Sequence, residues 1–505
     1  LIGLAGAGAS SGMAMAHWEI QGWMILILGW VFVPFYTRSM VYTMPEFLER
    51  RYNPQSRTIL SVISLVSYVL TKVAVTVYAG GLVFQQVFGI KELWGIDFFW
   101  IAAIGLVVLT ALYTIFGGMK SVLYTSVLQT PILLLGSLII LVLGFKELGG
   151  WDEMMRVCGA VTVNDYGDTM TNLIRSNDDA NFPWLGALIG SAIIGFWYWC
   201  TDQFIVQRVL SGKNEMEARR GTIFGAYLKL LPVFLFLIPG MIAFALHQKY
   251  IGAGGEGFLP TLANGTANAD AAFPTLVAKL LPAGVKGLVV CGILAALMSS
   301  LASLFNSSAM LFTIDFYKRF RPETPEKKLV GIGQVATVVI VILGILWIPI
   351  MRSVGDVLYT YLQDVQSVLA PGIAAAFLLG ICWKRTSAQG GMWGLIAGMV
   401  IGLTRLGAKV YYSNAGEVAD STFKYLFYDM NWLFFCGWMF LFCIIVVIVV
   451  SLATKAPTAE KIQGLVFGTA TKEQKAATRA SWNHWDIIHT VIILAITGAF
   501  YWYFW

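Results

Sequence analysis

The chain carries little charge. Only 12% of its 505 residues are Asp, Glu, Lys or Arg, whereas 58% are hydrophobic and the mean hydropathy is +0.72. Because apolar runs of twenty or more residues recur along its length, the composition excludes an ordinary soluble domain and predicts an all-α, polytopic membrane protein. The net charge of +6 could indicate nucleic-acid binding, but the basic residues stand in short connecting loops. We therefore interpret them as topology signals beside a lipid bilayer and expect no nucleic-acid partner.

Cysteine and histidine are also scarce. Five of the six cysteines lie in or beside apolar runs, and only Cys158 lies in an expected outer loop, which excludes an extracellular disulfide framework. The four histidines are scattered and form no metal or nucleophile pattern, so we expect that the protein is not an enzyme. The sequence opens on Leu1 rather than on methionine and enters an apolar segment at once. We expect that earlier membrane helices precede it.

Twelve segments are long and apolar enough to span a membrane. They are 10–37, 56–88, 98–117, 121–145, 184–208, 218–246, 284–317, 328–351, 356–381, 388–412, 431–453 and 485–505. Most Lys and Arg residues fall in alternate loops, around residues 38–57, 120, 208–220, 318–328, 384–385 and 455–479. The positive-inside rule makes that side cytoplasmic, so both ends of the chain are expected to face outward.

The run Trp197-Tyr198-Trp199-Cys200-Thr201-Asp202-Gln203 stands deep inside one of these spans. A helix that begins near Trp184 reaches Tyr198 after about fourteen residues, which is roughly 20 Å at ~1.5 Å per residue and past the middle of a ~30 Å hydrocarbon core. An interfacial aromatic belt is the alternative, but such belts lie at the headgroups. Aromatic and polar side chains at this depth are expected to face protein or a water-filled cavity.

Four ionisable residues lie at depth within the spans: Glu19, Lys72, Asp202 and Lys229. Intramembrane charges are costly and mark a pathway or a binding site. Lys229 is too deep to reach the interface easily, and its alternative role is a structural ion pair with Asp202 or Glu19. For Lys72 the sequence leaves an ion pair and a water-lined position equally open. Gln21 stands two residues after Glu19, so an acid and an amide are expected to face one cavity near the outer end. Together with an ammonium they suit a polyhydroxylated ligand, because each hydroxyl both donates and accepts.

Two further spans carry candidate polar sites. Ser299 and Ser300 follow Ala296 in a helix whose Ser303 and Ser307 are better explained by close helix packing. For the adjacent serines, hydroxyl ligands to Na⁺ are an equal alternative to packing. Gln363 precedes Ala370-Pro371-Gly372, and the Pro and Gly predict a broken helix that lines a cavity.

Taken together, these stretches resemble the sodium:solute symporter family, and within it the sodium/glucose cotransporter branch. The matching stretches, which run in order along nearly the whole chain, are Gly3 to Gly6, Thr43 to Glu46, Gly117-Gly118, Trp197 to Arg208, Tyr227 to Lys229, Ala295 to Asn306, Phe312 to Tyr317 and Trp383 to Arg385. A chance match of this length and order is excluded.

The resemblance implies a LeuT-type inverted-repeat fold with a midplane site and discontinuous helices. Residues 1–381 would form the transport core without its first helix, and 382–505 would add helices with a cytoplasmic loop near 454–484. The twelve spans would then be those of a family member of about fourteen helices that lacks the first two. The Trp-Tyr-Trp span would be the broken helix of the second repeat.

The resemblance also implies a function and its residues. Glu19, Lys229 and Gln363 would hydrogen-bond the hydroxyls of a monosaccharide, and Tyr198 would stack on the sugar as an inner gate, with Trp199 beside it. The outer gate would consist of Leu4, Trp18 and Tyr359. The sodium site would consist of the Ala296 carbonyl, Ser299 and Ser300. The expected activity is import of a glucose- or galactose-type sugar coupled to Na⁺ by alternating access.

Two departures from the family pattern concern the number of ions. Many members carry an acid where this chain has Ser126, and members with a second sodium site tend to carry a hydroxyl where Ala302 stands. Both changes remove oxygen ligands, so we expect one Na⁺ per sugar. The alternatives are another cargo, namely myo-inositol, sialic acid or an amino acid, or a sodium channel or sensor without coupled transport. Because cysteine-rich outer loops are absent, we expect a bacterial inner (plasma) membrane, and no obligate protein partner is evident.

Overall fold

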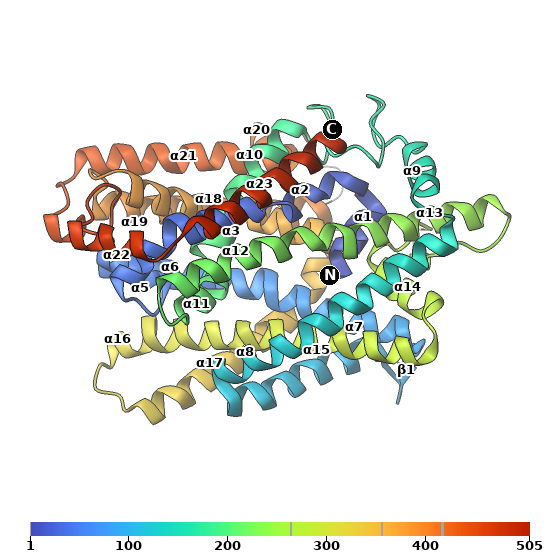
Figure 1. Cartoon of the computed structure of the whole chain (residues 1–505), viewed down its shortest axis with the longest axis horizontal. Helices are drawn as coiled ribbons and strands as arrows, with labels where there is room; N and C mark the ends of the chain where they lie inside the picture. The colour runs from blue at the N-terminus through green and yellow to red at the C-terminus, as the bar shows by residue number, and fades with distance from the viewer. Residues whose placement is uncertain (1, 263–264, 355–356, 416–418) are drawn as a thin grey trace.

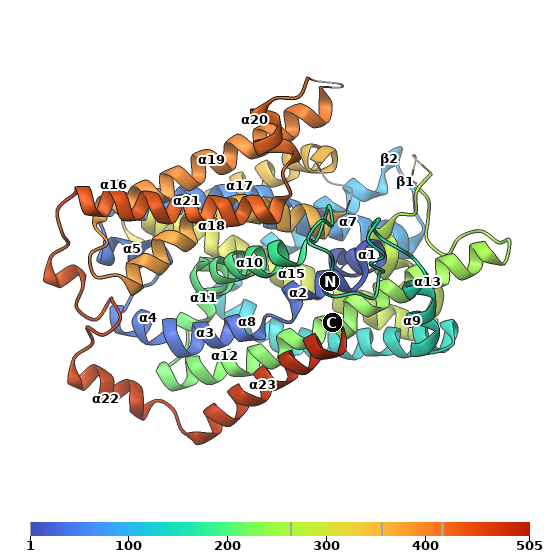
Figure 2. The ribbon, with the colours of Figure 1, turned by 90° about the horizontal axis from the view of Figure 1, so that it is seen from above.

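The computed structural model describes residues 2–262, 265–354, 357–415 and 419–505, without the side chains of residues 113, 115–123, 125, 126, 128 and 350–354. Long helices lie side by side along one direction and form a helical bundle (Figures 1 and 2). The strands β1 (Glu92–Leu93) and β2 (Ile96–Asp97) form a small antiparallel hairpin. The protein is therefore almost wholly helical, as the composition predicts.

The first half of the chain contains α1 Ile2–Ser11, η1 Gly12–Met15, α2 Ala16–Glu19, α3 Gly22–Ile27, η2 Leu28–Phe32, α4 Val33–Ser39, α5 Met44–Arg51, α6 Pro54–Ser67, η3 Tyr68–Val73, α7 Ala74–Phe88, α8 Phe98–Leu148, α9 Trp151–Gly159, α10 Trp184–Gly195, η4 Phe196–Thr201, α11 Gln203–Leu210, α12 Glu215–Pro232, η5 Val233–Leu237 and α13 Ile238–Gly252. The second half contains η6 Ala269–Ala271, α14 Ala272–Leu280, α15 Ala283–Met310, η7 Leu311–Tyr317, α16 Lys318–Phe320, α17 Glu326–Val354, α18 Leu358–Cys382, α19 Ala388–Asn414, α20 Thr422–Lys424, η8 Tyr425–Asp429, α21 Trp432–Ala453, η9 Ala459–Lys461, α22 Lys472–Ala480 and α23 His484–Tyr503.

Within the described residues, eleven helical segments are long and apolar enough to cross a membrane. Each matches one of the predicted spans, and the twelfth, 98–117, corresponds to the shorter apolar stretch Phe98–Leu112 in α8. The basic elements α5, α16 and α22 lie at one end of the bundle, at the left of Figure 1, and α9 and β1 lie toward the other end. The loops predicted to be cytoplasmic therefore share one end of the bundle.

The predicted beginning of the first span, residue 10, falls at the end of an earlier helix, α1. Helix α1 already starts at Ile2 and is separated from α2 by a 3₁₀ turn in which Gly12 has φ +64°. A Cβ on Gly12 would lie 2.1 Å from the Met170 carbonyl oxygen, and the next amide, Met13, donates to that carbonyl at 2.8 Å. Glycine is needed at this turn because the outer loop approaches the backbone so closely. Helix α1 is thus a separate short element that packs on α13, α14 and α18.

The Trp-Tyr-Trp span is discontinuous, as the resemblance implies. Its last outer segment, η4, is a π-helix, a form that is common at functional sites. The helix stops at Asp202, whose backbone is extended (φ −79°, ψ 127°), and α11 begins with the Asp202 side chain accepting from the Phe204 amide. The break places an acid and a capped helix start within the bundle.

The broken helix predicted at Ala370-Pro371-Gly372 is wrong, because α18 continues through Pro371 to Cys382. These small residues serve close packing instead. A Cβ on Gly372 would lie 2.9 Å from the Gly398 Cα, so α18 and α19 touch backbone to backbone at this point. Small residues at such contacts are typical of packed membrane helices.

The acid Asp270 in η6, on the outer side of the bundle, contacts both α18 and α1. Its carboxylate accepts from the first amide of α18, Leu358, at 3.1 and 3.3 Å, and it packs directly against Gly6 of α1. Because the carboxyl group is fully buried, its pKa is raised to about 7 despite this hydrogen bond. Folding therefore favours the protonated form relative to the unfolded chain.

A pKa raised above its unfolded value stabilises the fold fully only below the unfolded pKa, and that stability is lost as pH rises through about 7. Asp270→Asn keeps the acceptor for Leu358 without a charge. At pH 8 we expect it to raise the free energy of unfolding by at most about 4 kcal/mol, and the melting temperature with it. At pH 5 the increase should be less than half as large. Scanning fluorimetry of the purified protein checks this. The exposed acid Asp420, replaced by Asn, is the control and should change nothing measurable at either pH. An equal shift at both pH values would contradict the burial argument.

Candidate functional site

One cavity inside the bundle gathers most of the residues that the sequence singled out. Its volume is about 200 Å³ and it is lined by side chains from four separated segments. These are Trp18, Glu19 and Gln21 near α2, Ile194, Gly195, Tyr198 and Trp199 from α10 and η4, Lys229 from α12, and Tyr359, Leu362, Gln363 and Gln366 from α18. All five predicted substrate-binding residues are among them.

An ion pair closes one side of this cavity. The Lys229 ammonium donates to a Glu19 carboxylate oxygen at 2.5 Å, and the Tyr359 hydroxyl donates to the other oxygen. The two charged side chains are only 13% and 7% exposed. The Lys229 nitrogen also lies 5.3 Å from the centre of a Trp199 ring, within the range of a cation–π contact. Of the two pairings considered for Lys229, the structure forms the one with Glu19.

Aromatic side chains form the remaining walls. Tyr198 and Trp199 pack edge to face with ring centroids 5.1 Å apart. Trp18 stacks on Trp432 of α21 at 5.4 Å, so it is held in place by a helix outside the predicted transport core. Leu4, the third residue of the predicted outer gate, is buried in α1 but does not line the cavity. The aromatic alternative for the Trp-Tyr-Trp run, a lipid-facing belt, is wrong because these rings face protein.

Two polar atoms of lining residues have no hydrogen-bond partner among the described residues. They are the Gln363 side-chain oxygen, an acceptor, and the Trp18 indole nitrogen, a donor. Buried polar groups in proteins nearly always have a partner, so these two atoms are free to bind a ligand in the cavity. A ligand hydroxyl can serve either atom, since it both donates and accepts.

Several lining residues were not predicted to bind substrate, although Gln21 was expected to face one cavity with Glu19. Gln21 stands two residues after Glu19 and donates to the Ser191 carbonyl at 2.9 Å; its oxygen fits only because Gly195 has no side chain. Gln366 follows Gln363 by three residues, which places both on one helix face. That spacing could have identified Gln366 as a lining residue, whereas nothing in the sequence distinguishes the apolar Ile194 and Leu362.

The predicted sodium residues lie on α15, and none of them lines the cavity. Ser299 is buried and takes part in contacts within the structure, Ala296 is half-buried and Ser300 is exposed. Ser307 donates back to the Ser303 carbonyl at 2.8 Å, which is the packing role predicted for that pair. Ala302 is buried in the same helix, and the side chain of Ser126 lies outside the described residues. The sodium assignment stays a prediction.

Lys72, left open by the sequence, is in an ion pair. Its ammonium contacts the Asp202 carboxylate at the helix break, and the Tyr68 hydroxyl donates to the same acid at 2.8 Å. None of the three lines the cavity, but the ammonium lies 4.9 Å from the centre of the Tyr198 ring, which does. A second buried charge pair thus lies directly beside the cavity wall.

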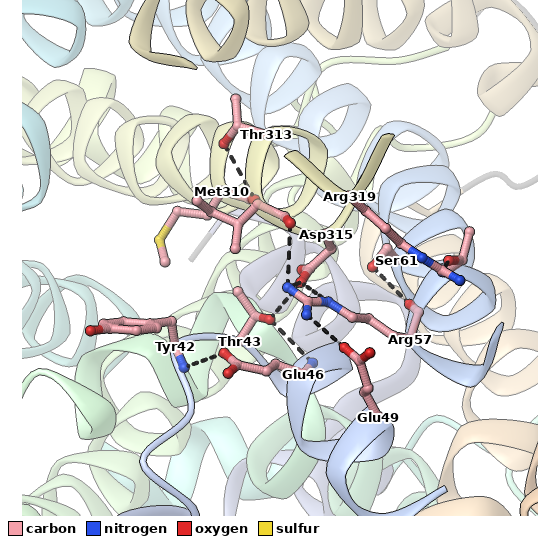
Figure 3. A network of polar contacts seen from close by, with 12 residues as sticks. Tyr42, Thr43, Glu46, Glu49, Arg57, Ser61, Met310, Thr313, Asp315 and Arg319 are labelled. Atoms are coloured by element: carbon pink, nitrogen blue, oxygen red, sulfur yellow. Dashed lines mark hydrogen bonds and ion pairs between the residues drawn. The ribbon is translucent and has the colours of Figure 1, made fainter. Parts of the chain in front are cut away.

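A polar network at the basic end of the bundle brings together two stretches that carry the family resemblance (Figure 3). Asp315 of η7 accepts from the Thr43 hydroxyl at 2.9 Å and from the Arg57 guanidinium at 2.7 Å. Arg57 also pairs with Glu49 at 2.7 Å. One residue on, the Met44 amide donates to the Gln203 side-chain oxygen at 2.8 Å, which connects the network to α11.

Comparison with known proteins decides the family. The family model for the sodium:solute symporter family matches residues 1–398. The chain belongs to the sodium:solute symporter family. Members of this family are transporters that use Na⁺ as the coupling ion for a small solute, and the chain is a multi-pass membrane protein of this kind.

Curated relatives agree over most of the chain. It is 38% identical to a sheep protein named sodium/glucose cotransporter 1 over 475 residues, covering 90% of this chain and 70% of the relative. It is 35% identical to a human protein named sodium/myo-inositol cotransporter 2 over 481 residues, covering 93% and 70%. Among solved structures, a Na⁺-coupled sialic acid symporter has a TM-score of 0.68 at 21% identity and covers 90% of this chain and 87% of that one. The LeuT-type fold predicted from the sequence is confirmed.

The unpaired oxygen of Gln363 makes a prediction that separates stability from function. Gln363→Leu replaces a buried, unsatisfied acceptor by an apolar group of similar size, so the melting temperature should stay the same or rise. Na⁺-dependent transport should fall about tenfold or more, since loss of one hydrogen bond to a ligand is worth ~1.5 kcal/mol or more at a desolvated site.

The measurements are scanning fluorimetry and Na⁺-dependent uptake of labelled galactose into proteoliposomes. Gln85→Leu makes the same replacement outside the cavity, next to the β1–β2 hairpin, and is the control that should leave uptake unchanged. Unchanged uptake in the Gln363 variant would remove this residue from the solute site.

Proposed function

We propose that the protein imports a monosaccharide of the glucose or galactose type together with Na⁺ by alternating access. The observation that carries the proposal is the cavity itself. An acid, an ammonium and an amide with an unpaired oxygen surround a space of about 200 Å³, and four aromatic side chains, Trp18, Tyr198, Trp199 and Tyr359, also line it. Polar groups of both donor and acceptor kind beside flat aromatic faces suit a pyranose, which has hydroxyls at its rim and apolar C–H faces.

In this proposal Glu19, Lys229 and Gln363 hydrogen-bond the sugar hydroxyls. Because Lys229 and Glu19 already satisfy each other, sugar binding exchanges part of their pairing for charge-assisted bonds to hydroxyls. Tyr198 stacks on the ring as the inner gate and Trp199 lines the same wall. The amino-acid alternative is less suitable, because the single ammonium in the cavity is already paired with the single carboxylate.

Trp18, Tyr359 and Leu4 form the outer gate. Two observations support this assignment: Trp18 and Tyr359 line the cavity, and α1 abuts the second of them, since a Cβ on Gly3 would lie 3.2 Å from the Tyr359 Cβ. A shift of α1 would therefore displace Tyr359, whose hydroxyl donates a hydrogen bond to Glu19.

The Na⁺ ion binds the Ala296 carbonyl and the Ser299 and Ser300 hydroxyls, because a hard cation prefers oxygen ligands. Ion binding stabilises an outward-open state that has the higher sugar affinity, and closure of the outer gate followed by opening past Tyr198 releases both inward. One inward Na⁺ contributes ~2.3 kcal/mol per 100 mV. At ~1.4 kcal/mol per tenfold this supports roughly forty-fold sugar accumulation from 100 mV alone.

The second candidate cargo is myo-inositol, favoured by the 35% identity to the human relative of that name over 93% of this chain. A cyclic polyol has the same rim of hydroxyls, so the lining groups suit it almost equally well. Sialic acid is a weaker candidate, because its carboxylate would meet Glu19.

The proposal also covers the setting of the protein. Residues 1–381 form the transport core and 382–505 add the outer helices with a cytoplasmic loop near 454–484. The membrane is a bacterial inner (plasma) membrane. The support for this is that the predicted outer loops hold one cysteine, Cys158, and so lack a cysteine-rich pattern. The curated relatives quoted above come from animals.

Uptake of labelled glucose, galactose and myo-inositol into proteoliposomes, with and without a Na⁺ gradient, tests the function. We expect concentrative, Na⁺-dependent uptake of a hexose, and we expect Lys229→Ala to reduce it at least tenfold because the variant leaves Glu19 unpaired at the site. Lys409→Ala removes another half-buried lysine, paired with Asp364 away from the cavity, and controls for lost stability. Sodium flux without solute accumulation would indicate a channel instead, and undiminished uptake in Lys229→Ala would refute the site.

The ion count has its own measurement. With Ser126 and Ala302 in place of oxygen ligands that other members carry, we expect one charge to move per sugar. Parallel measurement of charge and labelled sugar in the same proteoliposomes gives this ratio. A ratio near two would contradict the prediction, and Ser299→Ala should lower the apparent Na⁺ affinity severalfold without changing the ratio.

A further inference from the structure

Beside the cavity, but not among its lining residues, a buried lysine is surrounded by aromatic rings. The Lys72 side chain is 9% exposed and stands in the π-helical segment η3. Its nitrogen lies 4.4 Å from the ring centre of Phe204, 4.7 Å from that of Tyr68 and 4.9 Å from that of Tyr198. The ammonium is thus in contact with rings that come from two different membrane spans.

The same ammonium is anchored to the broken helix. Its ion-pair partner Asp202 is 2% exposed and is itself the extended residue between η4 and α11. The carboxylate also accepts from the Tyr68 hydroxyl at 2.8 Å and from the Phe204 amide at 3.2 Å. Every contact of Asp202 therefore fixes the helix break or fastens it to η3, and the acid is fully satisfied without a ligand.

The position of Tyr198 gives this arrangement a function. Tyr198 lies four residues before Asp202 and toward the cavity, where it forms part of the wall. Its ring contacts the Lys72 ammonium, so the wall residue and the helix break are held by one cation. Segment η3 belongs to the span Pro54–Phe88 and packs on α15, α17 and α18. A single charge therefore fastens two spans together at the inner side of the cavity.

We propose that Lys72 is a positioning residue of the transport site, which holds the Tyr198 ring in place as the inner wall of the cavity through its ion pair with Asp202. This rests on the proposed function, since it assigns to Tyr198 the wall past which the solute leaves. The contact must separate when the solute passes toward the cytoplasm, because Tyr198 and Asp202 lie on the broken helix and Lys72 lies on a different span.

A purely structural pair and a positioning pair respond differently to neutral replacement. Removing one member of a buried pair leaves an unpaired charge and destabilises the protein, whereas removing both at once is often tolerated. Lys72→Met with Asp202→Asn removes both charges while the new amide oxygen can still cap α11. This double variant should fold like the wild type, but nothing then holds the Tyr198 ring electrostatically.

The test measures access to the cavity from the cytoplasmic side. Ile194, which lines the cavity, is replaced by cysteine in a background without the six native cysteines. Inside-out membrane vesicles are then treated with a membrane-impermeant maleimide, and the labelling rate is compared between variants. The matched control is a half-buried Lys–Asp pair, Lys409→Met with Asp364→Asn, whose members do not line the cavity.

We expect the Lys72/Asp202 double variant to label at least fivefold faster than the wild type, with a similar melting temperature. The Lys409/Asp364 variant and Lys72→Arg, which keeps a cation over the ring, should label within twofold of the wild type. If the double variant is not recovered, Lys72→Gln with Asp202→Asn answers the same question, because the two amides can hydrogen-bond each other without any charge. Labelling of the neutral variants at the wild-type rate overturns the proposal.

A second readout separates this proposal from the proposed function. In proteoliposomes the double variant should lose Na⁺-driven sugar accumulation and show several-fold faster downhill efflux of preloaded sugar. If the wild type accumulates no sugar, the proposed function fails, while the labelling rates still decide whether Lys72 holds the wall. If the wild type accumulates sugar and the neutral double variant does so equally well, Lys72 is structural only.

Discussion

The pairing of charges inside the membrane-spanning bundle is the constraint on which the rest of this structure depends. Glu19 pairs with Lys229, Lys72 with Asp202 and Lys409 with Asp364, and each pair joins different spans. An unpaired charge in the membrane interior is costly, so these residues must meet, and their meeting fixes how the spans pack. The first pair lies in the cavity wall and the second directly behind it. The same interactions that fold the bundle therefore shape its polar cavity.

The helix breaks also help to shape the polar interior of the bundle. The extended residue at Asp202 and the turn at Gly12 interrupt spans that would otherwise run straight through the bundle. Breaks at this depth are tolerated only where backbone groups find partners in protein or a cavity. At Asp202 the side chain itself caps the following helix, and at Gly12 the next amide finds the Met170 carbonyl. The acid at the first break is visible in the sequence, whereas the Gly12 turn depends on the distant Met170 carbonyl.

Much of this was predictable, and the failures have physical reasons. Hydropathy located the spans, and depth alone showed that Tyr198 faces protein, because polar aromatic groups cannot all face lipid. Which acid Lys229 meets was not predictable, since pairing depends on helix packing that no local pattern encodes. Pro371 indicated a break that does not exist, because Gly372 and Gly398 use the small residues for close contact. The contacts of Lys72 could not be predicted from the sequence, since the rings of Tyr198 and Phe204 come from a distant span.

The most direct measurement of the central claim, that this cavity holds the transported solute, is a structure determined with Na⁺ and galactose present. The account predicts sugar density beside the Tyr198 ring, with hydroxyls within hydrogen-bond distance of Glu19, Lys229 and the unpaired oxygen of Gln363. Sugar bound elsewhere in the bundle, or a cavity that stays closed by its ion pair while sugar occupies another site, would contradict it.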